Sequence, residues 1–288
     1  MRILHCCLSC FYIDEYNYQE NILPRQNMLD GHVVMILAST EIYSNNKSLG
    51  YIDSRAYYNE NSIKVIRIPY RFFPIKFISH KIRSYVGAIK VIETFAPDVI
   101  LFHGTCGYEL ISVAKYKQAH PNVKLFVDSH EDKNNSGRSF VSKNILHKMF
   151  YKHILNQALP CIDKIFYVTY ESATFLKEMY GIPESMLEYY PLGGTVVEGR
   201  ERENKRNCIR NQHKIGSSDI LLVHSGKMSK EKKTGDLVRA IHETQANNLR
   251  LLILGSMTDD VAKDVMPVVE VDSRISYLGW KEGDELMD

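Results

Sequence analysis

The sequence predicts an α/β protein whose sheets are mostly parallel. Short apolar segments alternate with segments of helical periodicity about ten residues long, as expected for consecutive βαβ units. The apolar segments are hydrophobic throughout rather than at every second residue, which is typical of strands covered by helices on both faces of a sheet. Because no run of eighteen apolar residues occurs, we expect no transmembrane helix.

The first domain is predicted to span residues 1–196. The Asp30-Gly31 pair is a typical C-terminal glycine signal for its first helix. We expect residues 39–62, which are polar and rich in Tyr and Asn, to be irregular. The predicted strands cover residues 3–8, 32–38, 63–68, 98–102, 124–127, 164–168 and 187–190. The predicted helices cover residues 19–29, 82–93, 108–118, 142–158 and 171–180.

A second domain is predicted for residues 218–288, after a linker at 197–217 that is dense in Arg, Glu, Lys and Asn. Its predicted strands and helices cover residues 219–224, 234–244, 249–254, 259–265 and 275–278, with a further helix beginning at 282. About seventy residues are few for a complete Rossmann-like half. We therefore expect this domain to be incomplete.

Composition indicates a soluble globular protein of one or two domains, since 44% of the 288 residues are hydrophobic. The first residues are too soon polar for a signal peptide and fit a buried strand better. Three of the six cysteines cluster at Cys6, Cys7 and Cys10, but a zinc site usually needs a second pair. We expect reduced core thiols in a cytoplasmic protein, and no metal.

The net charge of +2 is unevenly distributed. Residues 61–92 and 133–162 contain Lys and Arg interleaved with aromatic residues, and no acid. These stretches are either solvated helix faces beside core aromatics, or a basic rim. Such a rim would contact the anionic inner face of a membrane or a phosphate-bearing acceptor. We expect no nucleic-acid partner, because no recognised nucleic-acid module is visible.

Polar residues follow several of the predicted strands. His103, His130 and the segment from Ser225 to Lys232 each come directly after an apolar run. The carboxyl ends of parallel strands form the ligand-binding edge of such sheets, so these residues are predicted to line one cleft. The segment 225–232 follows a predicted strand and combines a glycine turn, lysines and the start of a helix. This combination is suited to binding a diphosphate. The sequence contains no Rossmann GxGxxG, no Walker loop and no GxSxG elbow.

In order and spacing, motifs along nearly the whole chain resemble the group 1 (family 4) retaining glycosyltransferases of the GT-B fold. The Ser225-Gly226-Lys227 turn with Lys232 five residues on is similar to the family's Gly-Arg-x4-Lys segment. Further similar segments are 18–21 (YQEN), 30–34 (DGHVV), 97–104 (PDVILFHG), 163–183, 190–194 (YPLGG), 251–255 (LLILG) and 275–280 (ISYLGW). The resemblance implies two Rossmann-like domains with mostly parallel sheets, the second incomplete.

The sequence departs from the family's pattern in three places. The glycine pair often found after the first strand is replaced by residues 13–17 (IDEYN). Lys227 stands where the family usually has Arg, which keeps the charge but loses the bidentate fork. The family's E-x7-E acids, which hold the donor sugar and ribose, would lie beyond Asp288.

The resemblance assigns roles to both ends of the site. Lys227 and Lys232, with backbone N–H groups after Gly226, would neutralise the leaving diphosphate; otherwise they belong to a solvated lysine-rich helix start. His103 would line the catalytic centre and touch the donor sugar, unless it is a structural strand-end histidine. His130 and Glu131 would position the sugar or acceptor, or hold structural hydrogen bonds.

Tyr18, Gln19 and Glu20 open the first predicted helix and would contact donor or acceptor. Glu20 is equally well placed for the first helical turn alone. No cofactor is implied, because cationic side chains take the place of the divalent cation that other transferases use.

The resemblance implies sugar transfer from a nucleotide diphosphate sugar to a glycan or lipid-linked acceptor, with retention, in surface polysaccharide biosynthesis. One alternative is a non-catalytic fragment or interaction protein that keeps the fold and has lost the missing acids. The other is a nucleotide-sugar epimerase of the same fold.

Overall fold

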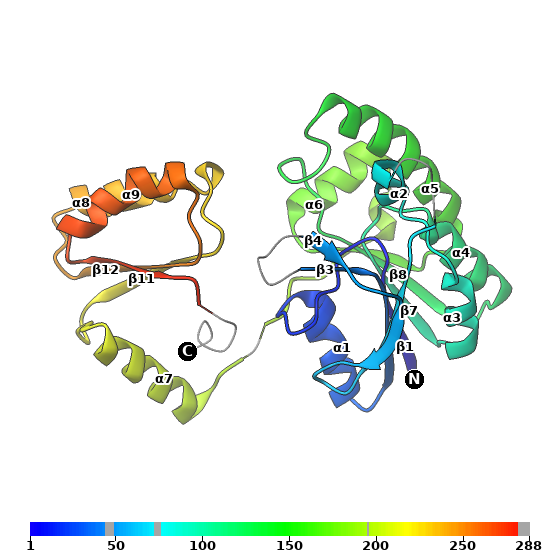
Figure 1. Cartoon of the computed structure of the whole chain (residues 1–288), viewed down its shortest axis with the longest axis horizontal. Helices are drawn as coiled ribbons and strands as arrows, with labels where there is room; N and C mark the ends of the chain where they lie inside the picture. The colour runs from blue at the N-terminus through cyan, green and yellow to red at the C-terminus, as the bar shows by residue number, and fades with distance from the viewer. Residues whose placement is uncertain (44–48, 72–75, 195, 282–288) are drawn as a thin grey trace. The chain divides into compact units, whose positions relative to one another are not determined.

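The protein is described by a computed structural model that covers residues 1–43, 49–71, 76–194 and 196–281. The chain divides into two compact units, Met1–Gly194 and Thr195–Asp288 (Figure 1). Each unit has its own sheet and its own core, so each is described separately.

Unit 1 is built on an eight-stranded sheet with strand order β10-β9-β8-β7-β1-β2-β6-β5. Neighbouring strands are parallel, except that β5 runs antiparallel to β6. The strands are β1 (Arg2–Cys7), β2 (Val33–Ser39), β5 (Arg55–Tyr58), β6 (Lys64–Ile68), β7 (Val99–His103), β8 (Lys124–Ser129), β9 (Lys164–Tyr167) and β10 (Leu187–Tyr189). A separate two-stranded ribbon pairs β3 (Glu41–Tyr43) with β4 (Leu49–Tyr51).

Both faces of this sheet are covered, as its apolar strands predict. Leu4, Leu37 and Phe102 point into the larger core cluster, together with residues of helices α3, α4 and α5. Cys7 and Ile36 point into a second cluster against Met28 of helix α1. The helices of unit 1 are α1 (Gln19–Leu29), α2 (Lys76–Ile82), α3 (Ala88–Phe95), α4 (Glu109–Ala119), η1 (Val141–Tyr151), α5 (Lys152–Ala158), η2 (Leu159–Cys161), α6 (Tyr170–Phe175), η3 (Leu176–Tyr180) and η4 (Glu184–Met186).

The strand order reverses at β1. The chain runs from β1 to β2 and β6 on one side, and then crosses to β7 on the other side of β1. Ligands of open α/β sheets bind at the carboxyl ends of the strands at such a switch point. The loops after β1, β7 and β8 are therefore where a site is expected.

Two expectations for unit 1 need correction. The region 39–62, predicted to be irregular, contains β3, β4 and β5. The predicted helix at 82–93 begins only at Ala88, because Arg83 (φ 53°) and Gly87 (φ 86°) adopt left-handed conformations that interrupt a helix. By contrast, Gly31 (φ 83°) follows the first helix as the glycine signal predicts.

Unit 2 contains a three-stranded parallel sheet of order β11-β12-β13, built from β11 (Ile220–Ser225), β12 (Leu249–Leu254) and β13 (Ile275–Gly279). Its helices are α7 (Gly199–Gln212), η5 (Lys230–Lys232), α8 (Thr234–Glu243) and α9 (Asp259–Val271). The predicted linker at 197–217 thus contains α7, and the helix predicted from 282 lies outside the described residues. No helix in the described ranges is long and apolar enough to cross a membrane.

Candidate functional site

A cleft of about 540 Å³ opens at the switch point of unit 1. We call it the strand-end cleft, because residues from the carboxyl ends of β1, β7 and β8 line it together with the start of α1. The lining residues are Ser9, Cys10, Phe11, Tyr18, Glu20, Arg83, Gly104, Asp128, His130, Glu131 and Asn135. Tyr18, Glu20, His130 and Glu131, which the sequence analysis proposed as site residues, therefore meet in one cavity.

Gly104 lets the loops after β1 and β7 approach each other. Its φ of 95° is a conformation that favours glycine, and a Cβ there would lie 2.9 Å from the Ser9 Oγ. Its N–H donates to the Asp128 Oδ1 at 2.8 Å. This hydrogen bond fixes one carboxylate oxygen at the base of the cleft.

His103 is fully buried and does not line the cleft. We predicted that it touches the donor sugar; in the structure its partners are protein side chains. Its Nδ1 lies 2.6 Å from the Asp128 Oδ2, and its Nε2 lies 3.1 Å from the His5 Nδ1. The His5 Nε2 in turn lies 2.9 Å from the Asn27 Oδ1.

These contacts define a consistent set of proton positions, assigned from the hydrogen-bond network. With the His5 Nε2–H donating to Asn27, the His5 Nδ1 accepts from His103, which then carries protons on both nitrogens. Burial acts to lower the pKa of His103, but the Asp128 carboxylate outweighs it and raises that pKa to about 10. Burial, with the His103 charge, lowers the pKa of His5 to about 3, so His5 stays neutral.

Asp128 is therefore an anion held in a buried ion pair. Burial alone would raise its pKa, but His103 and then His130 hold the pKa well below its usual range. The His130 Nε2 lies 3.8 Å from the Asp128 Oδ2, which is an ion-pair distance and too long for a hydrogen bond.

His130 has a polar atom to offer a ligand. Its Nε2 is buried and has no hydrogen-bond partner among the described residues. Burial acts to lower the pKa of His130, whereas the Asp128 carboxylate raises it above the ordinary value. The His130 side chain therefore lines the cleft with the Asp128 carboxylate behind it.

Glu131 connects this cleft to a second one of about 570 Å³. Its carboxylate accepts hydrogen bonds from the Thr105 hydroxyl and, at 2.7 Å, from the Cys106 thiol. We call the second cavity the helix-side cleft, because the start of η1 forms one wall. It is lined by Ser9, Lys81, Arg83, Cys106, Glu131, Asn135, Ser136, Gly137, Arg138, Ser139, Ser142, Leu146, His147 and Tyr151.

One trio in the described part of the chain has the composition of a metal site. Ligand atoms of Cys106, Glu131 and His147 lie within 4.8 Å of one another. The Tyr180 hydroxyl lies 2.6 Å from the His147 Nδ1 and 3.5 Å from the Cys106 Sγ. Since these side chains already bond to one another, the trio is accounted for as a buried polar network.

The start of α1 contributes unequally. Tyr18 and Glu20 line the strand-end cleft, whereas Gln19 does not. Both amide atoms of Gln19 are buried without a hydrogen-bond partner among the described residues. Such an orphaned amide is costly and calls for a bound water or ligand atom.

The predicted phosphate loop lies at the carboxyl end of β11 in unit 2. The Gly226 N–H donates to the Leu254 carbonyl at 2.9 Å, and the Met228 N–H donates to the Ser256 carbonyl at 2.8 Å, so the loop is fixed to the end of β12. A Cβ on Gly255 would overlap the carbonyl oxygen of Gly226, which explains glycine at that position. Lys227 and Lys232 are exposed, and the described residues give neither side chain an ion pair or hydrogen bond.

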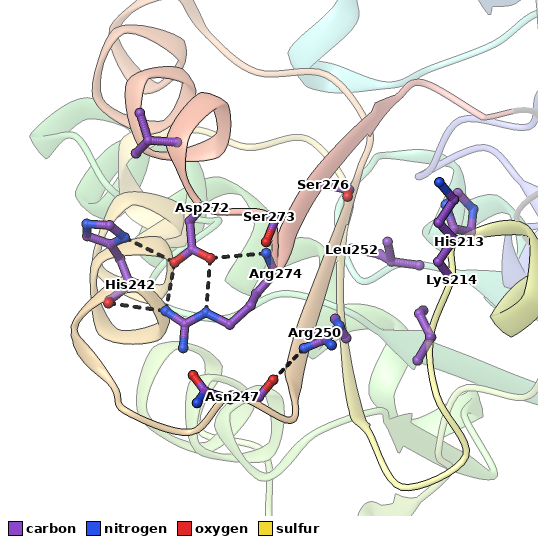
Figure 2. A pocket seen from close by; sticks show the side chains of 12 residues that line it. His213, Lys214, His242, Asn247, Arg250, Leu252, Asp272, Ser273, Arg274 and Ser276 are labelled. Carbon is purple, nitrogen blue, oxygen red and sulfur yellow. Dashed lines mark hydrogen bonds and ion pairs between the residues drawn. The ribbon is translucent and has the colours of Figure 1, made fainter.

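A larger cavity of about 740 Å³ lies at the opposite, amino-terminal edge of the same sheet (Figure 2). His242, Asp272 and Arg274 gather on one side of it, and His213 and Lys214 on the other. It is charged, but its central charges are internally satisfied.

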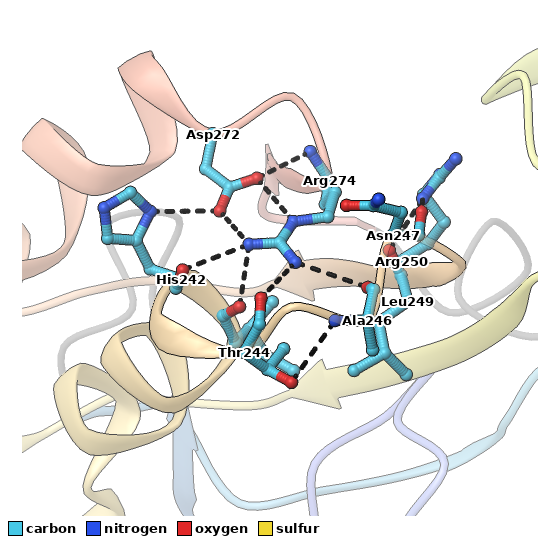
Figure 3. Close-up of polar contacts among 9 residues, drawn as sticks. His242, Thr244, Ala246, Asn247, Leu249, Arg250, Asp272 and Arg274 are labelled. Carbon is cyan, nitrogen blue, oxygen red and sulfur yellow. Dashed lines mark hydrogen bonds and ion pairs between the residues drawn. The ribbon is translucent and has the colours of Figure 1, made fainter.

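Arg274 is the centre of that satisfied network (Figure 3). Its guanidinium donates to both carboxylate oxygens of Asp272, at 3.0 and 2.7 Å. It also donates to the backbone carbonyls of Ile241, His242, Thr244 and Ala246. With its donors used in this way, Arg274 ties the end of α8 to the start of β13, and this cavity is interpreted as structural.

Asp128 and His5 were not singled out from the sequence, and Arg83 was included only as one member of the basic stretch 61–92. Asp128 could have been predicted, because it directly follows the predicted strand 124–127 and precedes Ser129 and His130. His5 lies in the middle of an apolar strand and Arg83 in a basic stretch. Nothing in their spacing distinguishes them from their neighbours.

Several solved structures are similar to this chain over nearly its whole length. Anabaena HepE in complex with UDP is 12% identical and has a TM-score of 0.60; the match covers 100% of this chain and 71% of HepE. Starch synthase IV from Arabidopsis thaliana, bound to ADP and acarbose, is 13% identical with a TM-score of 0.60, covering 100% and 75% of the two chains. The UDP-GlcNAc 2-epimerase from Neisseria meningitidis, bound to UDP-GlcNAc, is 12% identical with a TM-score of 0.53, covering 99% and 74%.

No family model and no curated protein matches the sequence. At these low identities the likeness shows the fold alone. The chain therefore has the α/β fold of the GT-B glycosyltransferases, as its motifs predicted. Many activities share a fold, so the activity has to be argued from the site.

Proposed function

We propose that the protein is a glycosyltransferase that moves a sugar from a nucleotide diphosphate sugar to a glycan or lipid-linked acceptor. The observation that carries this proposal is a pair of incompletely satisfied strand-end sites on a GT-B fold. Unit 2 offers Lys227 and Lys232 beside a glycine turn, and unit 1 offers His130 in the strand-end cleft.

Transfer with retention assigns a task to each of these groups. The bond between the anomeric carbon and the diphosphate oxygen breaks, while the acceptor oxygen bonds to the same face of that carbon. The acceptor proton passes to the departing diphosphate. Lys227 and Lys232 stabilise the charge that develops on the diphosphate, which removes the need for a metal ion. His130, held by Asp128, donates a hydrogen bond to a sugar hydroxyl, and Tyr18 and Glu20 contact the bound sugar or acceptor.

The acceptor is proposed to be presented at an anionic membrane surface, in surface polysaccharide biosynthesis. Helix η1 exposes Val141, Ile145 and Met149 at a spacing of four residues, directly after the exposed Phe140. No acid occurs in residues 133–162. An apolar helix face flanked by lysines suits the interface of an anionic bilayer. Flotation with phosphatidylglycerol vesicles tests this contact, and Ile145→Ser with Met149→Ser is expected to abolish it.

Product analysis with a panel of UDP- and ADP-sugars tests the proposed reaction. The full chain is incubated with each donor, with and without a crude glycolipid acceptor fraction. Acceptor-dependent release of nucleotide, with the sugar attached to the acceptor, is the expected result. Binding of nucleotide without any turnover would instead favour a non-catalytic interaction protein.

The similarity to the Neisseria epimerase makes sugar epimerisation the second candidate. The same incubations separate the two, because an epimerase needs no acceptor. Conversion of the free donor into its epimer in the absence of acceptor would replace the proposed function.

A further inference from the structure

Arg83 presents an unused cation between the two clefts of unit 1. It lines both the strand-end cleft and the helix-side cleft. Its guanidinium lies 5.8 Å from the centre of the Phe11 ring. Among the described residues, no hydrogen bond and no ion pair engages this guanidinium, although an arginine carries five N–H donors.

The backbone around Arg83 is nevertheless tightly fixed. The Tyr151 hydroxyl donates to the Lys81 carbonyl at 2.7 Å, and the Tyr108 N–H donates to the Ile82 carbonyl at 2.8 Å. On the other side, the Glu109 carboxylate accepts the Tyr85 N–H at 2.8 Å. Arg83 itself has a φ of 53°, a strained conformation for a residue with a side chain.

Gly107 leaves the space that this conformation needs. A Cβ on Gly107 would lie 3.1 Å from the Arg83 Cβ, and the Gly107 φ of 136° already excludes most side chains. Strain and fixation of this kind are retained where a side chain must be aimed. Here they aim a cation that has no hydrogen bond or ion pair in the described part of the chain.

The surroundings of Arg83 in the helix-side cleft suit an oxyanion. Arg138 is exposed on the same wall and also lacks an ion pair or hydrogen bond from its side chain within the described residues. Ser136, Ser139 and Ser142 add hydroxyl groups, and the first turn of η1 begins there, where helix geometry favours anions. Glu131 is the acid of this cleft, and its carboxylate is occupied by Thr105 and Cys106.

We propose that the helix-side cleft binds a phosphate group carried by the acceptor, with Arg83 as its principal ligand and Arg138 as a second. The arginine fork matches phosphate geometry, which a lysine would not reproduce. Because both clefts share Arg83, the phosphate would lie next to the acceptor hydroxyl that the strand-end cleft holds. That the phosphate belongs to a sugar acceptor rests on the proposed function, whereas binding of an anion in this cleft does not.

Calorimetry with inorganic pyrophosphate tests this site directly. The full chain carries Lys227→Ala and Lys232→Ala, so that the loop of unit 2 does not contribute. Pyrophosphate is expected to bind, and Arg83→Gln in this background is expected to weaken binding about tenfold or more, the size of one lost charge-assisted hydrogen bond. Arg138→Ala is expected to weaken it less. Arg200→Ala, an exposed arginine of α7, is the control matched for charge and is expected to change nothing.

Two results would overturn the anion site. One is a pyrophosphate affinity that Arg83→Gln leaves unchanged, or that cannot be measured in the chain carrying Lys227→Ala and Lys232→Ala. The other is loss of phosphatidylglycerol vesicle binding in Arg83→Gln with pyrophosphate affinity retained, which would make Arg83 a membrane contact. UDP binding to the unsubstituted chain is measured in parallel. Pyrophosphate binding without UDP binding would remove the proposed transferase function and leave the anion site standing.

Discussion

Arg274 in unit 2 and Arg83 in unit 1 are arginines at cavity walls with opposite hydrogen-bonding states. Arg274 donates to Asp272 and to a series of backbone carbonyls, so its charge is neutralised inside the protein. Arg83 has a fixed backbone and no polar partner for its side chain in the described residues. The larger cavity belongs to the satisfied arginine and the smaller clefts to the unsatisfied one.

This difference separates charges that hold the fold from charges available to a ligand. Arg274 belongs to the first class because its donors are used by Asp272 and backbone carbonyls, and the His103–Asp128 pair because both partners are buried. Arg83, Lys227, Lys232 and the His130 Nε2 belong to the second. The volume of a cavity does not distinguish the two classes, whereas the hydrogen-bonding state of each donor and acceptor does.

Replacing Arg274 by Ala is expected to give the largest effect on stability. The substitution leaves the buried Asp272 carboxylate and several backbone carbonyls without their donor, so unit 2 is expected to lose stability. Urea unfolding followed by hydrogen exchange in β12 and β13 measures the loss within unit 2. An unchanged free energy of unfolding would show that Arg274 does not stabilise the fold.

The pH dependence of unit 1 stability tests the His5–His103–Asp128 network. The pKa of His5 is lowered by burial to about 3, so its contribution is present above pH 6.5 and is lost as the pH falls. The pKa of His103 is raised to about 10, so its contribution is full below pH 6.5 and is lost as the pH rises. Stability should therefore peak near pH 6.5 and fall by up to about 1.4 kcal/mol per pH unit on either side.

Thermal melts across pH 4–10 of the unsubstituted chain and of His103→Gln measure this effect. The variant is expected to lose part of the decline on the alkaline side. An identical alkaline decline in both proteins would show that His103 is not the titrating group.

The fold was predictable where the sequence carries a local signal, such as the Asp30-Gly31 helix stop or the apolar run at 249–254. Residues 19–29 and 249–254 are the helix and strand that the sequence predicted, with the same bounds. Helix α7 was missed because its sequence, GRERENKRNCIRNQ, offers no apolar stripe. Strands β3, β4 and β5 are short and lie in a polar segment, and their pairing depends on partners elsewhere in the chain.

The position of the site could be predicted from the sequence, whereas most of its side-chain contacts could not. Parallel strands had to bring the loops after residues 103 and 130 to one edge, and they do. The burial of His103 could not be predicted, because it depends on register. Only the pairing of β7 with β8 sets His103 opposite Asp128, and only the β1–β7 pairing brings His5 close.

Substitution of Lys227 and Lys232 by Ala tests whether these two charges bind a ligand rather than stabilise the fold. Neither lysine has a partner in the described residues, so stability should not change, whereas affinity for UDP or ADP should fall about tenfold or more. Calorimetry with both nucleotides measures the affinity, and Lys263→Ala on α9 serves as the control for charge. Unchanged nucleotide affinity would remove the loop 225–232 from the donor site.

Only a small effect on stability is also expected for Arg83→Gln, and it is the most informative one. If Arg83 were structural like the buried Arg67, its loss would cost several kcal/mol. Since its guanidinium has no polar partner in the described residues, we expect a change of less than about 0.5 kcal/mol in the free energy of unfolding. Urea denaturation of unit 1 measures it, with Arg67→Gln as the contrast, because Arg67 is buried and hydrogen-bonded to Asp14, Tyr57 and the Ser39 carbonyl. If Arg83→Gln lowers the free energy of unfolding as much as Arg67→Gln does, Arg83 is a structural arginine. The proposal that it binds a ligand would then be wrong.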